Sequence, residues 1–213
     1  MRENKNFQKP KKAGAGISFV VDGKCERWYI ELLQQQENLR SNFKPKLPQK
    51  KKLKDQSDLV IELSKESEKV FWIIDFDTIL EETRKAKKGA KAPLREFQEL
   101  YNQYKNQENI IIIVNNPCLE YWYLLHFEHT SKYFATYERL EKPLKKYLPD
   151  YEKSEKYYKN PRLNIYKRLK NNLPEAIVNA QKLGEFDFGE IQTAGIAEMH
   201  KIFEELNIVE RKK

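Results

Sequence analysis

Acidic residues follow two apolar segments of this chain, where β-strands are predicted to end. Asp22 closes the sequence FVVD, and Asp75 and Asp77 close the sequence WIIDFD. Glu26 stands four residues after Asp22, one turn into a predicted helix. Ligands of open parallel sheets bind beyond the carboxyl ends of the strands. We therefore expect these four carboxylates to converge at one edge of a sheet.

Such a group of acids has a definite chemistry. Carboxylates that lie close together resist ionising unless a cation neutralises them, and oxygen ligands without His or Cys favour Mg²⁺ or Mn²⁺. Asp22, Asp75 and Asp77 are the predicted metal ligands. Asp75 and Asp77 would face the same way on an extended chain. A metal held in this way clamps a phosphodiester and activates water, and Lys24 would add a point charge beside the phosphate.

The same acids also have ordinary structural explanations. Thr78 and Glu81 have the spacing of a capping box, so Asp77 or Thr78 would then simply begin a helix. Asp22 and the glycine after it form a common turn pair. The sequence leaves both interpretations open.

A nucleotide-binding P-loop is excluded. That motif needs four residues between its glycines and a Ser or Thr after the lysine. Here six residues separate Gly16 from Gly23, and Cys25 follows Lys24.

Glu120 is a fifth candidate catalytic residue. It follows the Asn-Pro pair that closes the third apolar segment, so it is placed to reach the acidic edge. The alternative is a helix-stabilising acid in a first turn, favoured there by the helix dipole. His126 and His200 fit helix interiors better than catalysis, although either would supply a general acid near neutral pH if it approached the acids.

The elements that must position these residues indicate an α/β fold. Apolar runs at 17–21, 70–74 and 110–114 predict buried strands of a mostly parallel sheet between helices. The lysine-rich stretch that begins at Ser41 predicts a solvated loop with room for a short edge strand. Helices are predicted from residue 24 onward and over 58–67, 81–107 with a break near 88–93, 119–127, 132–147, 163–183 and 194–206.

Domain organisation follows from this pattern. We expect a flexible basic arm over residues 1–16 and a single domain over 17–213. Within it, residues 17–116 would form the α/β core and 117–213 an α-helical extension.

Composition narrows the class of protein. The 213 residues carry 40 Lys+Arg against 32 Asp+Glu, a net charge of +8, which favours polyanionic partners. Aromatic residues make up 12%, which argues against disorder. The two cysteines have no zinc-ligand spacing, and no secretion signal or membrane-length apolar run is present. We expect a cytoplasmic protein that does not enter membranes.

Two lysine-rich regions are candidate nucleic-acid contacts. Basic side chains bind phosphates, and aromatic side chains stack on unpaired bases. Lysines and tyrosines alternate over residues 145–159, although a charged surface with partly buried tyrosines explains that pattern equally well. The predicted nucleic-acid-binding residues are Lys24, Lys50, Lys51, Lys52, Lys153 and Lys156.

Three segments together resemble a known family. VVDGKCERWY, WIIDFD and VNNPCLEYWYLLHFE, in that order, are similar to RloB-like proteins, which include the AbiLii component of abortive-infection systems. The resemblance runs from about Ile17 through the helical half, and residues 193–206, with His200, look like the family's closing helix.

The resemblance implies a Toprim-type metal-binding domain and a Mg²⁺-dependent nuclease of anti-phage defence, commonly beside a partner ATPase. The family's acids fall on Asp22, Glu26, Asp75 and Asp77. The family pattern has Glu where this chain has Asp22, which is shorter by about 1.5 Å of reach, and Thr where it has Cys25. A shift of that size matters to active-site geometry.

Two hypotheses about function remain. The first is a Mg²⁺- or Mn²⁺-dependent nuclease acting on RNA or DNA. The second, favoured by the shorter acid at position 22, is a non-hydrolytic nucleic-acid-binding or regulatory subunit of a defence complex. Either would act with nucleic acid and an ATPase, with a homo-oligomer as a further possibility.

Overall fold

A five-stranded sheet forms the centre of the molecule. In the computed structural model, which describes residues 16–39, 44–48, 52–87 and 89–208, the strand order is β2-β1-β3-β4-β5. The first four strands in this order are parallel, and β5 is antiparallel to β4. The predicted α/β fold with a mostly parallel sheet is therefore confirmed. The strands are β1 (Ile17–Val21), β2 (Lys44–Lys46), β3 (Lys69–Asp75), β4 (Ile110–Asn116) and β5 (Ile196–Ala197).

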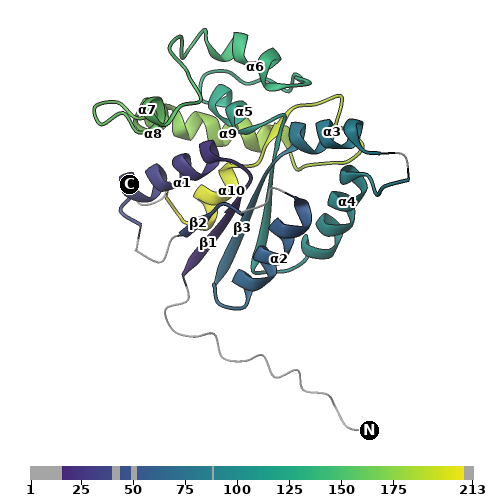
Figure 1. Ribbon diagram of the computed structural model, residues 1–213. Helices are drawn as coiled ribbons and strands as arrows, with labels where there is room; N and C mark the ends of the chain where they lie inside the picture. Colours follow the sequence, from purple (N-terminus) through teal and green to yellow (C-terminus); the bar gives the residue numbers. More distant parts are fainter. Residues whose placement is uncertain (1–15, 40–43, 49–51, 88, 209–213) are drawn as a thin grey trace.

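Two layers of helices cover the sheet (Figure 1). One layer packs on the face that carries Val20, Trp72 and Ile112, and the other on the face that carries Phe71 and Ile113. Successive strand residues point to opposite faces, so a strand buried on both sides is apolar throughout. The first layer contains α2 (Leu53–Ser64), α3 (Phe76–Lys85) and α4 (Pro93–Tyr104). The second contains α1 (Lys24–Gln36), α5 (Leu119–Leu125), α6 (Tyr137–Leu144), α7 (Glu155–Tyr158), α8 (Ile165–Leu169), α9 (Leu173–Leu183) and α10 (His200–Glu205).

Several predicted boundaries are corrected. The predicted helix at 58–67 begins earlier, at Leu53, and the one at 163–183 is divided at residues 170–172 by a 3-10 turn ahead of Pro174. The predicted helix at 132–147 is shorter, because it begins at Tyr137. The expected edge strand in the lysine-rich stretch is present as β2, where Pro45 is tolerated because the strand lies at the edge of the sheet.

The segment 194–206 is not one helix. Ile196 and Ala197 add an antiparallel strand to β4, and α10 begins only at His200. Between them, the buried carboxylate of Glu198 accepts hydrogen bonds from the backbone N–H of Val114 at 2.9 Å and of Phe186 at 3.1 Å. A strand of two residues carries too little periodicity to be predicted from sequence.

Two further expectations concern membrane insertion and the N-terminal basic arm. No described helix has both the length and the apolar character needed to cross a bilayer. The basic arm predicted over residues 1–16 falls, apart from Gly16, outside the described residues.

Gly195 allows the C-terminal segment to pack tightly beside α5. A Cβ atom at this position would stand 2.5 Å from the Tyr121 ring and 2.7 Å from the Lys132 carbonyl oxygen. The Tyr121 ring cannot easily move away, because its hydroxyl donates to the carbonyl oxygens of Thr130 and Lys132.

We therefore predict that Gly195→Ala lowers the free energy of unfolding by about 1–3 kcal/mol through overpacking. Chemical denaturation would measure the change. Gly189→Ala is the matched control, since its Cβ would meet Asp187 only at ordinary distances of 3.4 Å and more. Equal effects of the two substitutions would contradict the assigned packing.

Candidate active site

Five carboxylates lie at the carboxyl edge of the parallel strands. This edge is the end of the molecule beneath α5 and α6 (Figure 1). Asp22 follows β1, Asp75 ends β3, and Glu26, Asp77 and Glu120 lie in the first turns of α1, α3 and α5. Burial first, and then the charges of the other four acids, raise the pKa of Asp75 well above its usual value. The structure thus brings together all five acids that the sequence singled out. We call them the acidic cluster.

Three acids of the cluster, Glu26, Asp75 and Asp77, hold protons more tightly than ordinary carboxylic acids do. Burial raises the pKa of Glu26 to about 7, and the charges of Glu120 and Asp22 add to this effect. Burial likewise raises the pKa of Asp77 to about 6, although the Lys153 ammonium opposes the shift. Near neutral pH the cluster therefore retains protons that a bound cation would displace.

Asp75 and Asp77 do not share one extended strand, so the predicted alternation is wrong. Helix α3 begins at Phe76, which places Asp77 in a helical turn and also removes the capping box at Thr78. Asp75 instead holds the start of α5, since its Oδ1 accepts the Leu119 N–H at 3.0 Å. The Asp77 N–H donates to the carbonyl oxygen of Pro117 at 3.0 Å. Both acids are therefore tied to the turn between β4 and α5.

Asp22 is oriented by Gln56 of α2, a helix on the other face of the sheet from α1. The Gln56 side-chain amide donates to Asp22 Oδ1 at 3.1 Å, and its oxygen accepts the Trp72 indole N–H at 2.8 Å. Because an indole nitrogen only donates, Trp72 fixes which end of the amide faces Asp22. Gln56 is thus a positioning residue that the sequence did not reveal, because its partners lie 16 and 34 residues away.

Glu120 is fully buried, and its two carboxylate oxygens have different surroundings. Oε1 accepts the Tyr151 hydroxyl at 2.6 Å and lies 3.0 Å from the Lys153 ammonium. Oε2 is also buried and has no hydrogen-bond partner in the described part of the chain. A buried carboxylate oxygen without a partner is unfavourable. Oε2 is therefore the atom in the cluster most in need of a cation or a donor.

Lys153 enters the site rather than lining a separate surface. Its side chain is 37% exposed, yet its Nζ reaches buried Glu120 and lies 3.7 Å from the centre of the Tyr137 ring. Partial burial disfavours the ammonium form, but the surrounding negative charges, that of Glu120 foremost, together outweigh this effect and raise the pKa of Lys153. Lys153 is thus a permanent positive charge within the acidic cluster.

The other predicted nucleic-acid contacts are surface residues or lie outside the described ranges. Exposed positions are occupied by Lys24 at the start of α1, Lys52 just before α2 and Lys156 in α7, and Lys50 and Lys51 lie outside the described residues. The tyrosines that alternate with these lysines are mostly unable to stack on bases. Three of them are buried in the core: Tyr151, Tyr157 and Tyr158.

Gly23 makes room for one of the acids. A Cβ atom there would stand 2.6 Å from Oε2 of Glu26. The turn between β1 and α1 therefore needs glycine for space, because its φ of −138° is open to any residue. This observation explains the glycine that follows Asp22.

Asn115 is a second residue that the sequence analysis missed. It pairs in register with Asp75 on the neighbouring strand, so both side chains point to the same face of the sheet. The Asn115 side chain is fully buried, and neither its oxygen nor its nitrogen has a partner among the described residues. Its position directly after an apolar strand, like that of Asp22, was the signal available in the sequence.

Thiols and imidazoles do not supply a nucleophile or base here. Burial raises the pKa of Cys25 to about 12 and that of Cys118 well above its usual value, so both thiols stay protonated. Burial lowers the pKa of His126 to about 4 and also lowers that of His200. The predicted interpretation of both histidines as helix residues fits their burial.

The donor set fits a hard divalent cation, although its atoms are not yet gathered around one point. The cluster offers carboxylate oxygens, excess negative charge and the unpartnered Glu120 Oε2, which suit Mg²⁺ or Mn²⁺. No three His, Cys, Asp or Glu side chains within the described ranges lie close enough to hold one ion as they stand. Binding would therefore require acids such as Asp77 and Glu120 to turn toward a shared point.

Comparison with known proteins gives one result. The model of a family described as RloB-like protein matches residues 17–206. Neither the search of curated proteins nor that of solved structures found a match.

The raised pKa of Glu26 makes a prediction about stability and pH. In the folded state Glu26 has a pKa of about 7 and keeps its proton up to about that pH, whereas in the unfolded state its pKa is 4.5. The folded state is therefore favoured below pH 4.5, and this contribution is lost as the pH rises through 7. Glu26→Gln should be neutral at pH 4.5 and more stable than the wild type at pH 8 by up to about 3 kcal/mol.

Urea denaturation in EDTA at both pH values would measure this difference. Glu66→Gln is the control, because Glu66 is exposed and does not belong to the acidic cluster. A Glu26→Gln variant that is equally or less stable than the wild type at pH 8 would contradict the raised pKa of buried Glu26.

Proposed function

The chain belongs to the RloB-like family, and we propose that it is a Mg²⁺- or Mn²⁺-dependent nuclease with a Toprim-type site. Membership of the family is consistent with a role in defence. The observation that carries the proposal is the acidic cluster itself. Five acids come from the ends of two strands and the first turns of three helices; burial raises the pKa of three of them, Glu26, Asp75 and Asp77, and one buried oxygen of Glu120 has no partner among the described residues.

Each residue of the cluster has a role in this proposal. Asp22, Asp75 and Asp77 would hold the cation, and Glu120 would join them through Oε2. When bound, Mg²⁺ supplies positive charge and Lewis acidity at a phosphate oxygen. Gln56 keeps Asp22 in one orientation, so the shorter acid at this position has a fixed partner.

Proton transfer falls to Glu26. Its pKa of about 7 is close to the pH at which a general base is most effective. Glu26 lies beside Gly23, where no Cβ atom crowds its carboxylate. Lys153 places an ammonium next to these acids, where it would attract a phosphate and help to offset negative charge in the transition state.

A second candidate function is a nucleic-acid-binding or regulatory subunit that does not hydrolyse its ligand. It is favoured by the absence, within the described residues, of any three ligands close enough to hold an ion. In this account Lys153 permanently takes the place of the cation. Under either function we propose that the protein acts in abortive infection in the cytoplasm, together with an ATPase. Family membership is the support for these partners.

The nuclease proposal predicts metal-dependent cleavage that the double variant Asp75→Asn, Asp77→Asn lacks. Labelled transfer RNA, single-stranded DNA and plasmid would be incubated with the protein in Mg²⁺, Mn²⁺ or EDTA. We expect the cleavage rate of the variant to fall roughly 100-fold or more, because two carboxylate ligands of the cation and their negative charges are removed.

The double variant Asp58→Asn, Glu62→Gln is the matched control, since it removes two exposed carboxylates from α2. Cleavage that survives in the cluster variant would contradict the proposed site. Binding of nucleic acid without cleavage by the wild type in either metal would favour the second function.

A further inference from the structure

Helix α6 presents three different faces, and only two of them are used by the rest of the described structure. Leu140 and Leu144 pack into the core, and Tyr137 lies beneath the Lys153 ammonium. The remaining face carries Arg139 and Lys142 one turn apart, and Lys146 follows just beyond the end of the helix. A spacing of three and then four residues places all three on one side of the helix. We call these three cations the α6 basic face.

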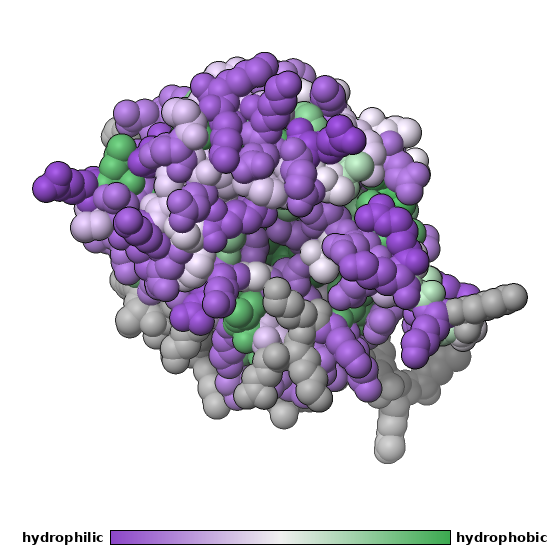
Figure 2. All heavy atoms as spheres, turned by 45° about the horizontal axis from the view of Figure 1, so that its top comes forward, coloured by the Kyte–Doolittle hydropathy of each residue, from purple (hydrophilic) through white to green (hydrophobic). Residues whose placement is uncertain are grey.

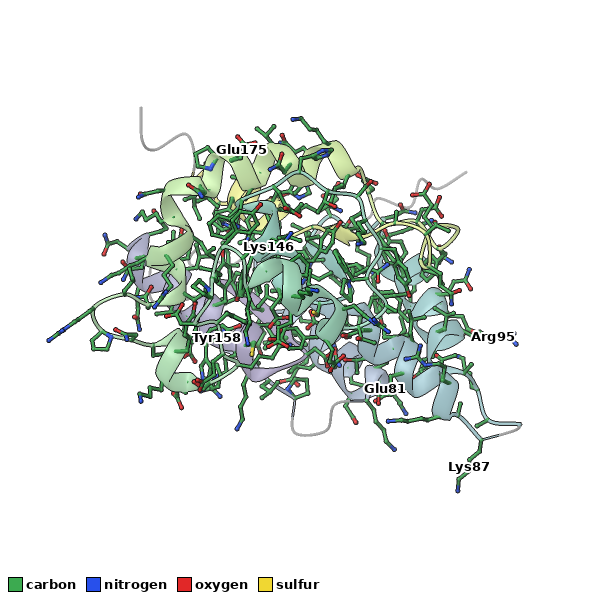
Figure 3. The ribbon with its side chains drawn as sticks, turned by 90° about the horizontal axis from the view of Figure 1, so that it is seen from above. Glu81, Lys87, Arg95, Lys146, Tyr158 and Glu175 are labelled. Atoms are coloured by element: carbon green, nitrogen blue, oxygen red, sulfur yellow. The ribbon has the colours of Figure 1, made fainter. Side chains whose placement is uncertain are left out.

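The cations of the α6 basic face are exposed and have no ion-pair partner in the described part of the chain. By contrast, the neighbouring Lys145 is paired with Glu141 at 2.8 Å on another side of the helix. Lys146 lies near the centre of the molecule when this end is seen from above (Figure 3). Three unpaired positive charges in so small an area attract a polyanion.

A groove runs beside these charges. It has a volume of about 640 Å³, and its walls include the α6 basic face, Lys132 and the half-buried aromatic ring of Tyr133. Its two acids each accept a hydroxyl hydrogen bond, Glu128 from Tyr147 and Glu138 from Thr136, and the four cations of the lining outnumber them. Hydrophilic side chains cover most of this end of the molecule (Figure 2). Positive charge beside an aromatic wall is the arrangement that holds single-stranded nucleic acid.

The groove is joined to the acidic cluster through α6 itself. Tyr137 contacts Lys153, which contacts Glu120, while the basic face lies on the other side of the same two-turn helix. A strand whose phosphates lie on the basic face could therefore continue around α6 toward the cluster. The path around half of a helix about 10 Å in diameter is roughly 16 Å long.

We infer that the α6 basic face and the Tyr133 groove bind a single-stranded segment of nucleic acid that leads to the acidic cluster. Arg139, Lys142 and Lys146 hold successive phosphates, and Tyr133 stacks on a base. This inference rests on the proposed nuclease function for the identity of the ligand. It assigns substrate binding to residues outside the acidic cluster, of which only Lys146 lies in a lysine-rich region that the sequence indicated.

The test compares two triple variants with equal charge. Arg139→Gln, Lys142→Gln, Lys146→Gln removes the basic face. Lys87→Gln, Lys105→Gln, Lys182→Gln removes three exposed lysines from elsewhere on the described surface, so each variant has a formal charge of +5 instead of +8. Fluorescence anisotropy with single-stranded RNA and DNA oligonucleotides in EDTA would measure binding over a range of salt concentrations, without any chemistry.

We expect the basic-face variant to bind about tenfold or more weakly, and the slope of log K against log salt to fall by roughly 2, about 0.7 for each lost phosphate contact. The control should lose little. Tyr133→Leu should weaken binding about fivefold with an unchanged salt slope, because a stacked base carries no charge. Circular dichroism melting would establish that each variant is folded.

Equal losses in the two triple variants would overturn the inference, and so would binding to vesicles of anionic lipid without binding to either oligonucleotide. The two proposals fail in different ways. Cleavage by the wild type with no effect of the basic-face variant on binding leaves the nuclease proposal and removes this one. If the wild type never cleaves and only the basic-face variant loses binding, the nuclease proposal is removed and the binding inference stands.

Discussion

The burial of several carboxylates side by side at one edge of the sheet is the constraint around which the molecule is organised. Asp75 and Glu26 are held where both burial and neighbouring charges oppose their ionisation. Buried acids in this arrangement are unfavourable without a bound cation, and they persist only because the surrounding structure holds them in place. The acids are fixed by backbone N–H groups, an amide, a tyrosine hydroxyl and one ammonium. The fold therefore holds these acids where a bound cation would favour their ionised form.

The two helical layers contribute different parts of this support. The layer with α2 supplies Gln56, which reaches Asp22 and is itself oriented by Trp72 from the sheet. The other layer supplies Glu120 at the start of α5, and the chain after α6 returns with Tyr151 and Lys153 to hold it. Helix α6 contacts Lys153 of the cluster through Tyr137 on one side and has the α6 basic face on another. Recognition of a polyanion and chemistry on it would thus share one helix.

The parts of the fold that were predictable from the sequence are those in which local pattern and burial agree. The apolar runs ending at Asp22 and Asp75 marked true strands, because strands buried on both faces must be apolar throughout. The placement of five acids at one edge followed from parallel topology. Contacts between distant segments were not predictable in this way. Gln56 has no local signature, Lys153 resembles any surface lysine, and β5 is two residues long. The position of Asp77 was wrong in detail, because α3 begins directly after the strand.

The most direct test of the account is a calorimetric titration of the protein with Mn²⁺ at pH 6.5, in two buffers of different ionisation enthalpy. The account predicts binding that releases about one proton or more, because Asp75 and Asp77, whose pKa values burial raises, must ionise to hold the ion. The double variant Asp75→Asn, Asp77→Asn should lose this binding. Binding that releases no proton, or that the variant retains, would contradict the claim that the acidic cluster is built for a cation.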